Sequence, residues 1–308
     1  MYGKLHQLAR QHGRLLGSAI SAVAIAAFAV ALSRVFSAPD AAALLVRHWD
    51  ALLLAMALYL ATYVPMAAAW LVLARAVGAG ADRRAMVRIY LVSQVGKYLP
   101  GNVGHLLGRA WLAERVGVPL RLTAWIMSLE VIVLLVAGAL AAAACLLLPG
   151  STAAARWTLP LAAVALALGL LAVALALSRR RLADLRPLLP QLRIALACYV
   201  GVFGVLAAAH CLLLGMIGGG GWTAGTVAQV VSAVVLSWLV GFMTPGAPAG
   251  LGVREMSLLT LLTPLFSAET VLATAAFMRM ASIAGDGIAW AMGLLLTRLA
   301  RQRDLAVA

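Results

Sequence analysis

A stretch of 15 residues occurs twice in this chain, and both copies interrupt apolar sequence. The first copy is VGKYLPGNVGHLLGR, residues 95–109, and the second is VGFMTPGAPAGLGVR, residues 240–254. A shift of 145 residues aligns Val, Gly, Pro, Gly and Arg of the two copies without a gap. Each Pro-Gly pair should break a helix, because proline lacks an N–H donor and glycine is weakly restrained. Broken helices in a membrane pack in protein or line a cavity, so these segments mark the expected substrate site.

The composition is that of a membrane protein. Of 308 residues, 64% are hydrophobic and only 11% are charged, which is too apolar for a soluble domain. Long apolar runs favour spanning helices, and the lack of period-2 alternation disfavours strands. At about 1.5 Å per residue, six runs are long enough for a hydrocarbon layer of about 30 Å. These expected spans lie at about 15–37, 50–74, 122–148, 157–177, 194–217 and 269–297.

Two broken segments, about 84–118 and 225–264, complete the expected topology as hairpins that enter and leave on one side. The same shift of 145 residues carries the first three spans onto the last three. We therefore expect one transmembrane domain, residues 1–308, made of two repeats, 1–148 and 149–308. Each repeat has three spans and one re-entrant hairpin broken at Pro-Gly. Because three is odd, the second repeat enters from the opposite face, so the predicted fold is an all-α polytopic membrane protein with inverted-topology repeats.

The basic residues support this topology. Of the 24 lysines and arginines, 18 fall in segments on one side, three on the other, and three within hydrophobic segments. The positive-inside rule then places both termini in the cytoplasm, with the protein in the cytoplasmic (inner) membrane. The net charge of +14 is thus explained without nucleic acid as a partner, and it would attract anionic lipid headgroups. The sequence predicts no cofactor, since it has no metal-ligand spacing, nucleotide fingerprint or nucleophile motif.

Charged side chains inside apolar segments each cost about 2.5–3.5 kcal/mol on insertion scales, so they need partners or a wet cavity. The candidate substrate-binding residues are Lys97, Asn102, Arg109, Glu130, Arg254, Glu255 and Arg279. The expected hairpin breaks are at Pro100, Gly101, Gly104, Pro245, Gly246, Gly250 and Gly252.

These charges have an alternative explanation as fixed ion pairs or interfacial groups. Arg109 can snorkel to the cytoplasmic interface, and Lys97 can contact carbonyls freed at the break. Glu255 cannot share a helical face with the residue before it, so it should meet another helix through Arg279. Asp286, flanked by two glycines, is placed nearer the cytoplasmic end and outside the candidate set.

Arg254 is harder to explain as an interfacial group, because it heads outward, where the positive-inside bias disfavours arginine. Past each break a new helix begins, with Asn102 as an N-cap in the first copy. Helix N-termini offer free N–H groups, so together with the basic side chains they suit phosphate or carboxylate. His105 lies one turn from Arg109 and can assist, or it can be a packed histidine, and His210 is expected to be a satisfied core histidine.

The segments KYLPGNVGHLLGRAWLAERVGVP and TPGAPAGLGVREMSLL resemble the two signature segments of the flippase-like family. This is the transmembrane region related to lysylphosphatidylglycerol synthase and to the multiple peptide resistance factor. The resemblance covers nearly the whole chain and is strongest at 96–119 and 244–259. It implies an all-helical domain with inverted repeats that moves lipids or lipid-linked groups between leaflets. The positions it singles out are Pro100, Gly101, Gly104, Arg109, Pro245, Gly250, Gly252, Arg254, Glu255 and Arg279.

The chain departs from the family pattern in two places. Members often carry an acid-Arg pair with a later acid after the first hairpin, whereas here Glu130 is followed by Val131. Bifunctional members also carry a soluble aminoacyl-transferase domain. This chain ends at Ala308, so a separate lipid-modifying synthase is the expected protein partner.

The sequence thus predicts a lipid flippase, a transporter and not an enzyme. Its substrate would be an anionic lipid or lipid-linked group with a phosphate headgroup, such as an aminoacyl-phospholipid or a polyprenyl-phosphate-linked sugar. A secondary transporter of a soluble anion is the first alternative, and it predicts a closed site without a lateral opening. An intramembrane lipid-headgroup transferase is the second, and the missing metal or nucleophile motif argues against it.

Overall fold

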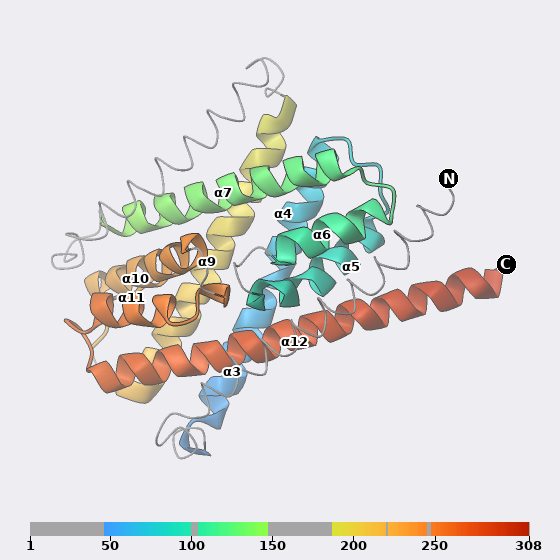
Figure 1. Cartoon of the computed structure of the whole chain (residues 1–308). Coiled ribbons are helices and arrows are strands. Elements are labelled where there is room, and N and C mark those ends of the chain that lie inside the picture. The colour runs from blue at the N-terminus through green and yellow to red at the C-terminus, as the bar shows by residue number, and fades with distance from the viewer. Residues whose placement is uncertain (1–45, 100–103, 147–186, 220, 245–247, 308) are drawn as a thin grey trace.

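The computed structural model describes residues 46–99, 104–146, 187–219, 221–244 and 248–307. Within these ranges every regular element is a helix (Figure 1). The elements are α3 (Trp49–Ala61), α4 (Tyr63–Ala76), α5 (Arg83–Ser93), η1 (Gln94–Tyr98), α6 (Gly104–Glu114), α7 (Leu120–Leu146), α9 (Leu189–Gly218), α10 (Ala224–Met243), η3 (Pro248–Gly250), α11 (Val253–Leu262) and α12 (Ala268–Val307). The expected spans at 15–37 and 157–177 lie outside the described residues.

Several of these helices are long and apolar enough to cross a membrane, which confirms the prediction of a multi-pass helical membrane protein. In the described part of the chain there are five such stretches: Trp49–Ala76, Leu120–Cys145, Leu189–Gly218, Ala224–Met243 and Ala268–Ala300. The fourth was expected to be one arm of a hairpin, yet its 20 residues suffice for a span. The described residues do not test the inverted relation of the repeats.

The two broken segments therefore have unequal first arms. The arm before the first break, α5, has 11 residues and contains three arginines, and Asp82 caps it by accepting from the Ala85 N–H at 2.9 Å. The arm before the second break, α10, has 20 residues without a charge and begins after the Thr223 cap. Charge at the start of α5 limits how far that arm can run in an apolar layer.

The expected span at 50–74 consists of two helices, α3 and α4, that meet at Thr62. The backbone there stays near helical values, with φ −63° and ψ −24°. Pro65 lies in the first turn of α4 and removes the N–H that would bond the Ala61 carbonyl, which accounts for the interruption.

Both helical arms end where the Pro-Gly pairs predict. Leu99 has φ −69° and ψ 147°, and Thr244 has φ −76° and ψ 112°, so each residue before a proline is extended. Steric clash with the proline ring disfavours helical backbone at that position. Pro100, Gly101, Asn102, Pro245 and Gly246 themselves lie outside the described residues.

Glycines let the chain turn back tightly at each break. A Cβ on Gly104 would lie 2.3 Å from the Gly96 carbonyl oxygen, and a Cβ on Gly250 would lie 3.0 Å from the Gly241 Cα. Gly250 and Gly252 also have positive φ, 70° and 82°, which costs other residues more than glycine. The predicted breaks at Gly104, Gly250 and Gly252 therefore coincide with close approaches or left-handed backbone.

The two broken segments meet in the middle of the molecule. Residues of η1 contact residues of η3, and α12 packs against η1, α5 and α11. In Figure 1, α12 runs along one side of the molecule past both segments. Helix α9 contacts α3, α4, α7, α10 and α12, and its buried residues Phe203, Leu213 and Leu214 belong to the apolar core. This packing places the charged residues of both breaks around shared interior space.

Candidate functional site

Two cavities meet at Arg254 in the second broken segment, and the larger of them is also lined by the first broken segment. The larger one, of about 90 Å³, is bordered by Lys97, Arg109, Glu130 and Arg254 among other residues; we call it the central cavity. The smaller one, of about 70 Å³, is bordered by Arg254, Glu255 and Arg279; we call it the second cavity. All six charged candidate residues therefore border one cavity or the other.

A buried ion pair closes one wall of the central cavity. The Arg109 guanidinium donates to the Glu130 carboxylate, and the two side chains are only 2% and 8% exposed. The Tyr199 hydroxyl donates to the other Glu130 oxygen at 2.5 Å. The Arg109 guanidinium also lies over the rings of Trp70 and Tyr90, 4.7 and 4.3 Å from their centroids. The alternative that Arg109 snorkels to the interface is wrong, because neighbouring groups enclose it.

Asp286 joins four elements at the first break. Its carboxylate accepts hydrogen bonds from Tyr59 at 2.8 Å, from Tyr98 at 2.6 Å, and from Tyr63. The Lys97 ammonium lies 2.7 Å from its Oδ2 atom. These donors come from α3, α4 and η1 and fix the first break to α12, because a buried carboxylate needs each partner. Asp286 was left outside the candidate set, yet its fully buried side chain belongs to this cluster.

The second break is fixed to α12 in a similar way. Arg279 donates to the Glu255 carboxylate from Nε at 2.7 Å and also from a terminal nitrogen. The other Glu255 oxygen accepts from the Gly252 N–H at 2.7 Å, at the start of α11. Arg279 also donates to the Ala249 carbonyl at 3.3 Å. The predicted contact of Glu255 with another helix through Arg279 is confirmed.

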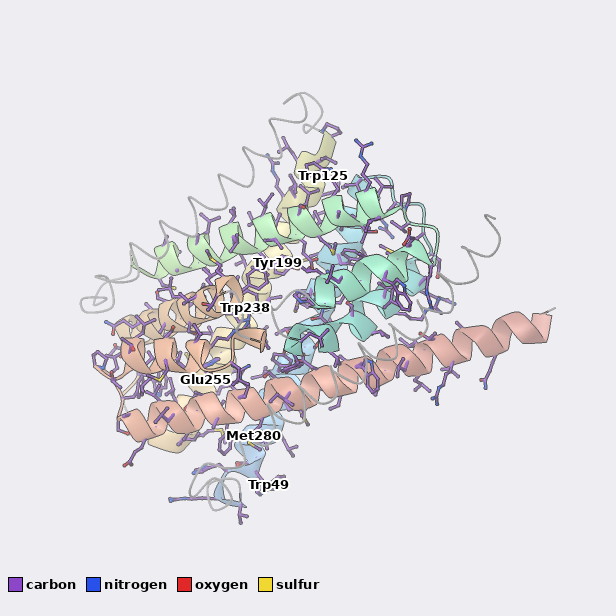
Figure 2. The ribbon with its side chains drawn as sticks, viewed as in Figure 1. Trp49, Trp125, Tyr199, Trp238, Glu255 and Met280 are labelled. Carbon is purple, nitrogen blue, oxygen red and sulfur yellow. The ribbon has the colours of Figure 1, made fainter. Side chains whose placement is uncertain are left out.

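Arg254 differs from the other interior cations. It borders both cavities, yet it is absent from the three ion pairs formed by described residues. Its buried Nε atom has no hydrogen-bond partner there, and its guanidinium lies 4.7 Å from the Trp238 ring centroid. Trp238 also borders both cavities. In Figure 2 its label lies between that of Tyr199, which borders the central cavity, and that of Glu255, which borders the second cavity.

Glycines make the space that Arg254 occupies. A Cβ on Gly241 would lie 2.4 Å from the Arg254 Cγ, and a Cβ on Gly250 would lie 2.7 Å from its Nε. The side chain therefore lies flat against the backbone of both arms of the second broken segment. Gly241 and Gly250 of the second broken segment are explained by the room that Arg254 needs.

The two histidines were weighed as packed residues. His210 borders the second cavity, and its Nδ1 lies 2.7 Å from the Leu206 carbonyl, so it is satisfied as expected. His105 borders the central cavity with Arg109, and its Nδ1 is buried without a partner among the described residues. His105 therefore remains available for a polar group in the central cavity.

Sequence reasoning left Asp286 outside the candidate set and did not identify the tyrosines that organise the first break with it. Tyr59 and Tyr63 are neighbours in the sequence, but Tyr98 and Asp286 lie far from them and from each other, so no local pattern joins the set. The available signal was Gly285. A Cβ at that position would lie 2.6 Å from the Tyr59 ring, so the glycine beside the acid marks close helix packing.

The sequence model of one protein family, the lysylphosphatidylglycerol synthase TM region, matches residues 14–289, which is most of the chain. The chain belongs to this family. Membership in the lysylphosphatidylglycerol synthase TM family confirms the resemblance of the two motif segments and indicates a lipid-related function in a membrane. No curated protein and no solved structure matches the chain.

Proposed function

We propose that this chain is a lipid flippase that moves an anionic lipid or lipid-linked group between leaflets, acting as a transporter and not as an enzyme. The observation that carries the proposal is Arg254, a cation that borders both cavities without an ion-pair partner among the described residues. An uncompensated charge in an apolar layer is costly unless water or a ligand solvates it. A phosphate headgroup would supply that compensation.

The walls of the central cavity favour a lipid over a soluble anion. Charged residues border it together with large apolar side chains, among them Met66, Phe203 and Phe242. A free anion gains nothing from apolar walls, whereas a lipid presents a charged headgroup and a hydrocarbon chain to such a mixed surface. Aminoacyl-phospholipids and polyprenyl-phosphate-linked sugars both have this character.

The mechanism we propose uses the two breaks as attachment points. Asp286 and Arg279 both lie on α12 and tie the first and second broken segments to that one helix, so the two segments would move together with it. Rocking of α12 and both segments against the remaining helices would open the cavities to either leaflet in turn, as in other transporters with broken helices. The proposal includes the cytoplasmic membrane as location, both termini in the cytoplasm, and a separate lipid-modifying synthase as partner.

The test is lipid scrambling in reconstituted vesicles, with fluorescent phospholipid and polyprenyl-phosphate lipids. Arg254→Ala should slow translocation at least about tenfold, because about 1.4 kcal/mol of lost binding changes a rate that much. Arg298 is exposed near the end of α12, so Arg298→Ala is the matched control and should leave the rate unchanged. Equal scrambling by wild type and Arg254→Ala would refute the proposal. Uptake of a water-soluble phosphate without any scrambling would favour the soluble-anion alternative.

A further inference from the structure

We infer that the site selects a phosphodiester, a phosphate with a single negative charge, over a phosphomonoester or pyrophosphate. The inference rests on the proposed function and specifies its substrate class. It is drawn from the balance of charge around the cavities. The charged side chains that border a cavity, or pair with one that does, are Lys97, Arg109, Glu130, Arg254, Glu255, Arg279 and Asp286.

Three acids and three of the four cations in this set neutralise one another. The pairs are Lys97 with Asp286, Arg109 with Glu130, and Arg279 with Glu255. With the two histidines counted as neutral, Arg254 leaves the set with one uncompensated positive charge. A ligand with one negative charge would bring the described interior to neutrality.

The paired cations are not free to take a second negative charge. Asp286 is fully buried and holds Lys97 together with three tyrosine hydroxyls. Arg109 is enclosed by two aromatic rings and its acid. Arg279 gives two N–H groups to Glu255. Releasing any of them leaves a carboxylate buried without a counter-charge, which is strongly unfavourable.

A doubly charged phosphate would therefore keep one negative charge uncompensated in the cavity. A phosphodiester avoids this, because its phosphate carries one charge at any pH near neutrality. A phosphomonoester gains a second charge above a pKa that lies near 6 in phosphorylated side chains. Near neutral pH a phosphodiester therefore carries one negative charge and a phosphomonoester carries up to two. The site compensates only the first of these charges.

The experiment compares phosphatidylglycerol with phosphatidic acid, carrying the same fluorescent acyl chain, in vesicles at pH 8.5. We expect wild type to translocate phosphatidylglycerol at least about tenfold faster, a difference of about 1.4 kcal/mol. Glu255→Gln frees Arg279 beside Arg254 and should shift this ratio toward phosphatidic acid by a similar factor. Glu114 is exposed at the end of α6, so Glu114→Gln is the control and should leave the ratio unchanged.

The outcomes separate this inference from the proposed function. Equal or faster movement of phosphatidic acid by wild type, abolished by Arg254→Ala, would overturn the charge matching and leave the flippase in place. Movement of neither lipid above protein-free vesicles would remove the proposed function, and the inference with it. An unchanged ratio in folded Glu255→Gln would also overturn the inference. If Glu255→Gln does not fold, the wild-type ratio decides.

Discussion

Substituting Gly241 by alanine should displace Arg254 without disturbing the backbone. Gly241 lies inside α10 with no unusual φ, so alanine suits its conformation. The added Cβ would meet the Arg254 Cγ at 2.4 Å, whereas ordinary contacts begin near 3.4 Å. The arginine side chain must therefore move by about 1 Å, the difference between these two distances, and it will leave its place over Trp238.

The expected cost comes from two opposing terms. Overpacking a filled interior costs about 1–3 kcal/mol, and replacing glycine by alanine in a helix returns about 0.5–1 kcal/mol. Gly241→Ala should thus lower the stability of the folded protein by up to about 2.5 kcal/mol. Translocation should fall at least about tenfold, because a displacement of about 1 Å in a charged positioning group has large effects on rate.

Thermal unfolding in detergent and lipid scrambling measure these two effects. Gly201 lies in α9, and a Cβ there meets nothing within 4 Å, so Gly201→Ala is the control and should be neutral or stabilising. In an Arg254→Ala background the Cγ is gone, and Gly241→Ala should then stabilise by about 0.5–1 kcal/mol. Destabilisation by the same amount in both backgrounds would refute the explanation.

Two further substitutions test how the first broken segment is held. Asp286→Asn leaves Lys97 without its counter-charge, so we expect a loss of about 3–5 kcal/mol in unfolding experiments, partly restored by adding Lys97→Met; equal stability of Asp286→Asn and wild type would contradict this. Gly104→Ala places a Cβ 2.3 Å from the Gly96 carbonyl oxygen, a backbone atom that cannot rotate away. It should lower the unfolding temperature, whereas Gly108→Ala, whose Cβ meets nothing within 4 Å, should not.

The position of the breaks could be predicted because their cause is local. Each break combines a proline, which disfavours helical backbone at the residue before it, with a glycine directly after, and Leu99 and Thr244 are extended accordingly. The length of each arm depends on the charged residues in it. Helix α5 contains three arginines and is short, whereas α10 contains no charged residue and is long. Treating the two copies as equal hairpins overlooked this difference.

The burial of Asp286 could not be predicted from its place in the last span. That span was expected to end near residue 297, which placed Asp286 toward the cytoplasmic end. The structure encloses its carboxylate completely among protein groups. Its partners Tyr59, Tyr63 and Tyr98 reach it only through tertiary packing, and a single sequence carries no record of such contacts.

The acids of the site could be listed from the sequence, but their pairing could not. Glu255 with Arg279 was anticipated, because adjacent residues on a helix face different directions. Glu130 was left open between a fixed ion pair with no partner named and a ligand contact, and the geometry now assigns it to Arg109. Arg254 was already singled out by its outward position, but only the three pairs show that it has no ion-pair partner among the described residues.

The most direct measurement is a structure of the wild-type protein in a phosphatidylglycerol bilayer, with the bound lipid visible. We expect phosphate density within about 2.7–2.9 Å of the Arg254 guanidinium, the distance typical of charge-assisted hydrogen bonds. The lipid phosphate bound elsewhere, with Arg254 paired to a protein carboxylate or directed to bulk solvent, would contradict the assignment of Arg254 as the cation that receives the headgroup.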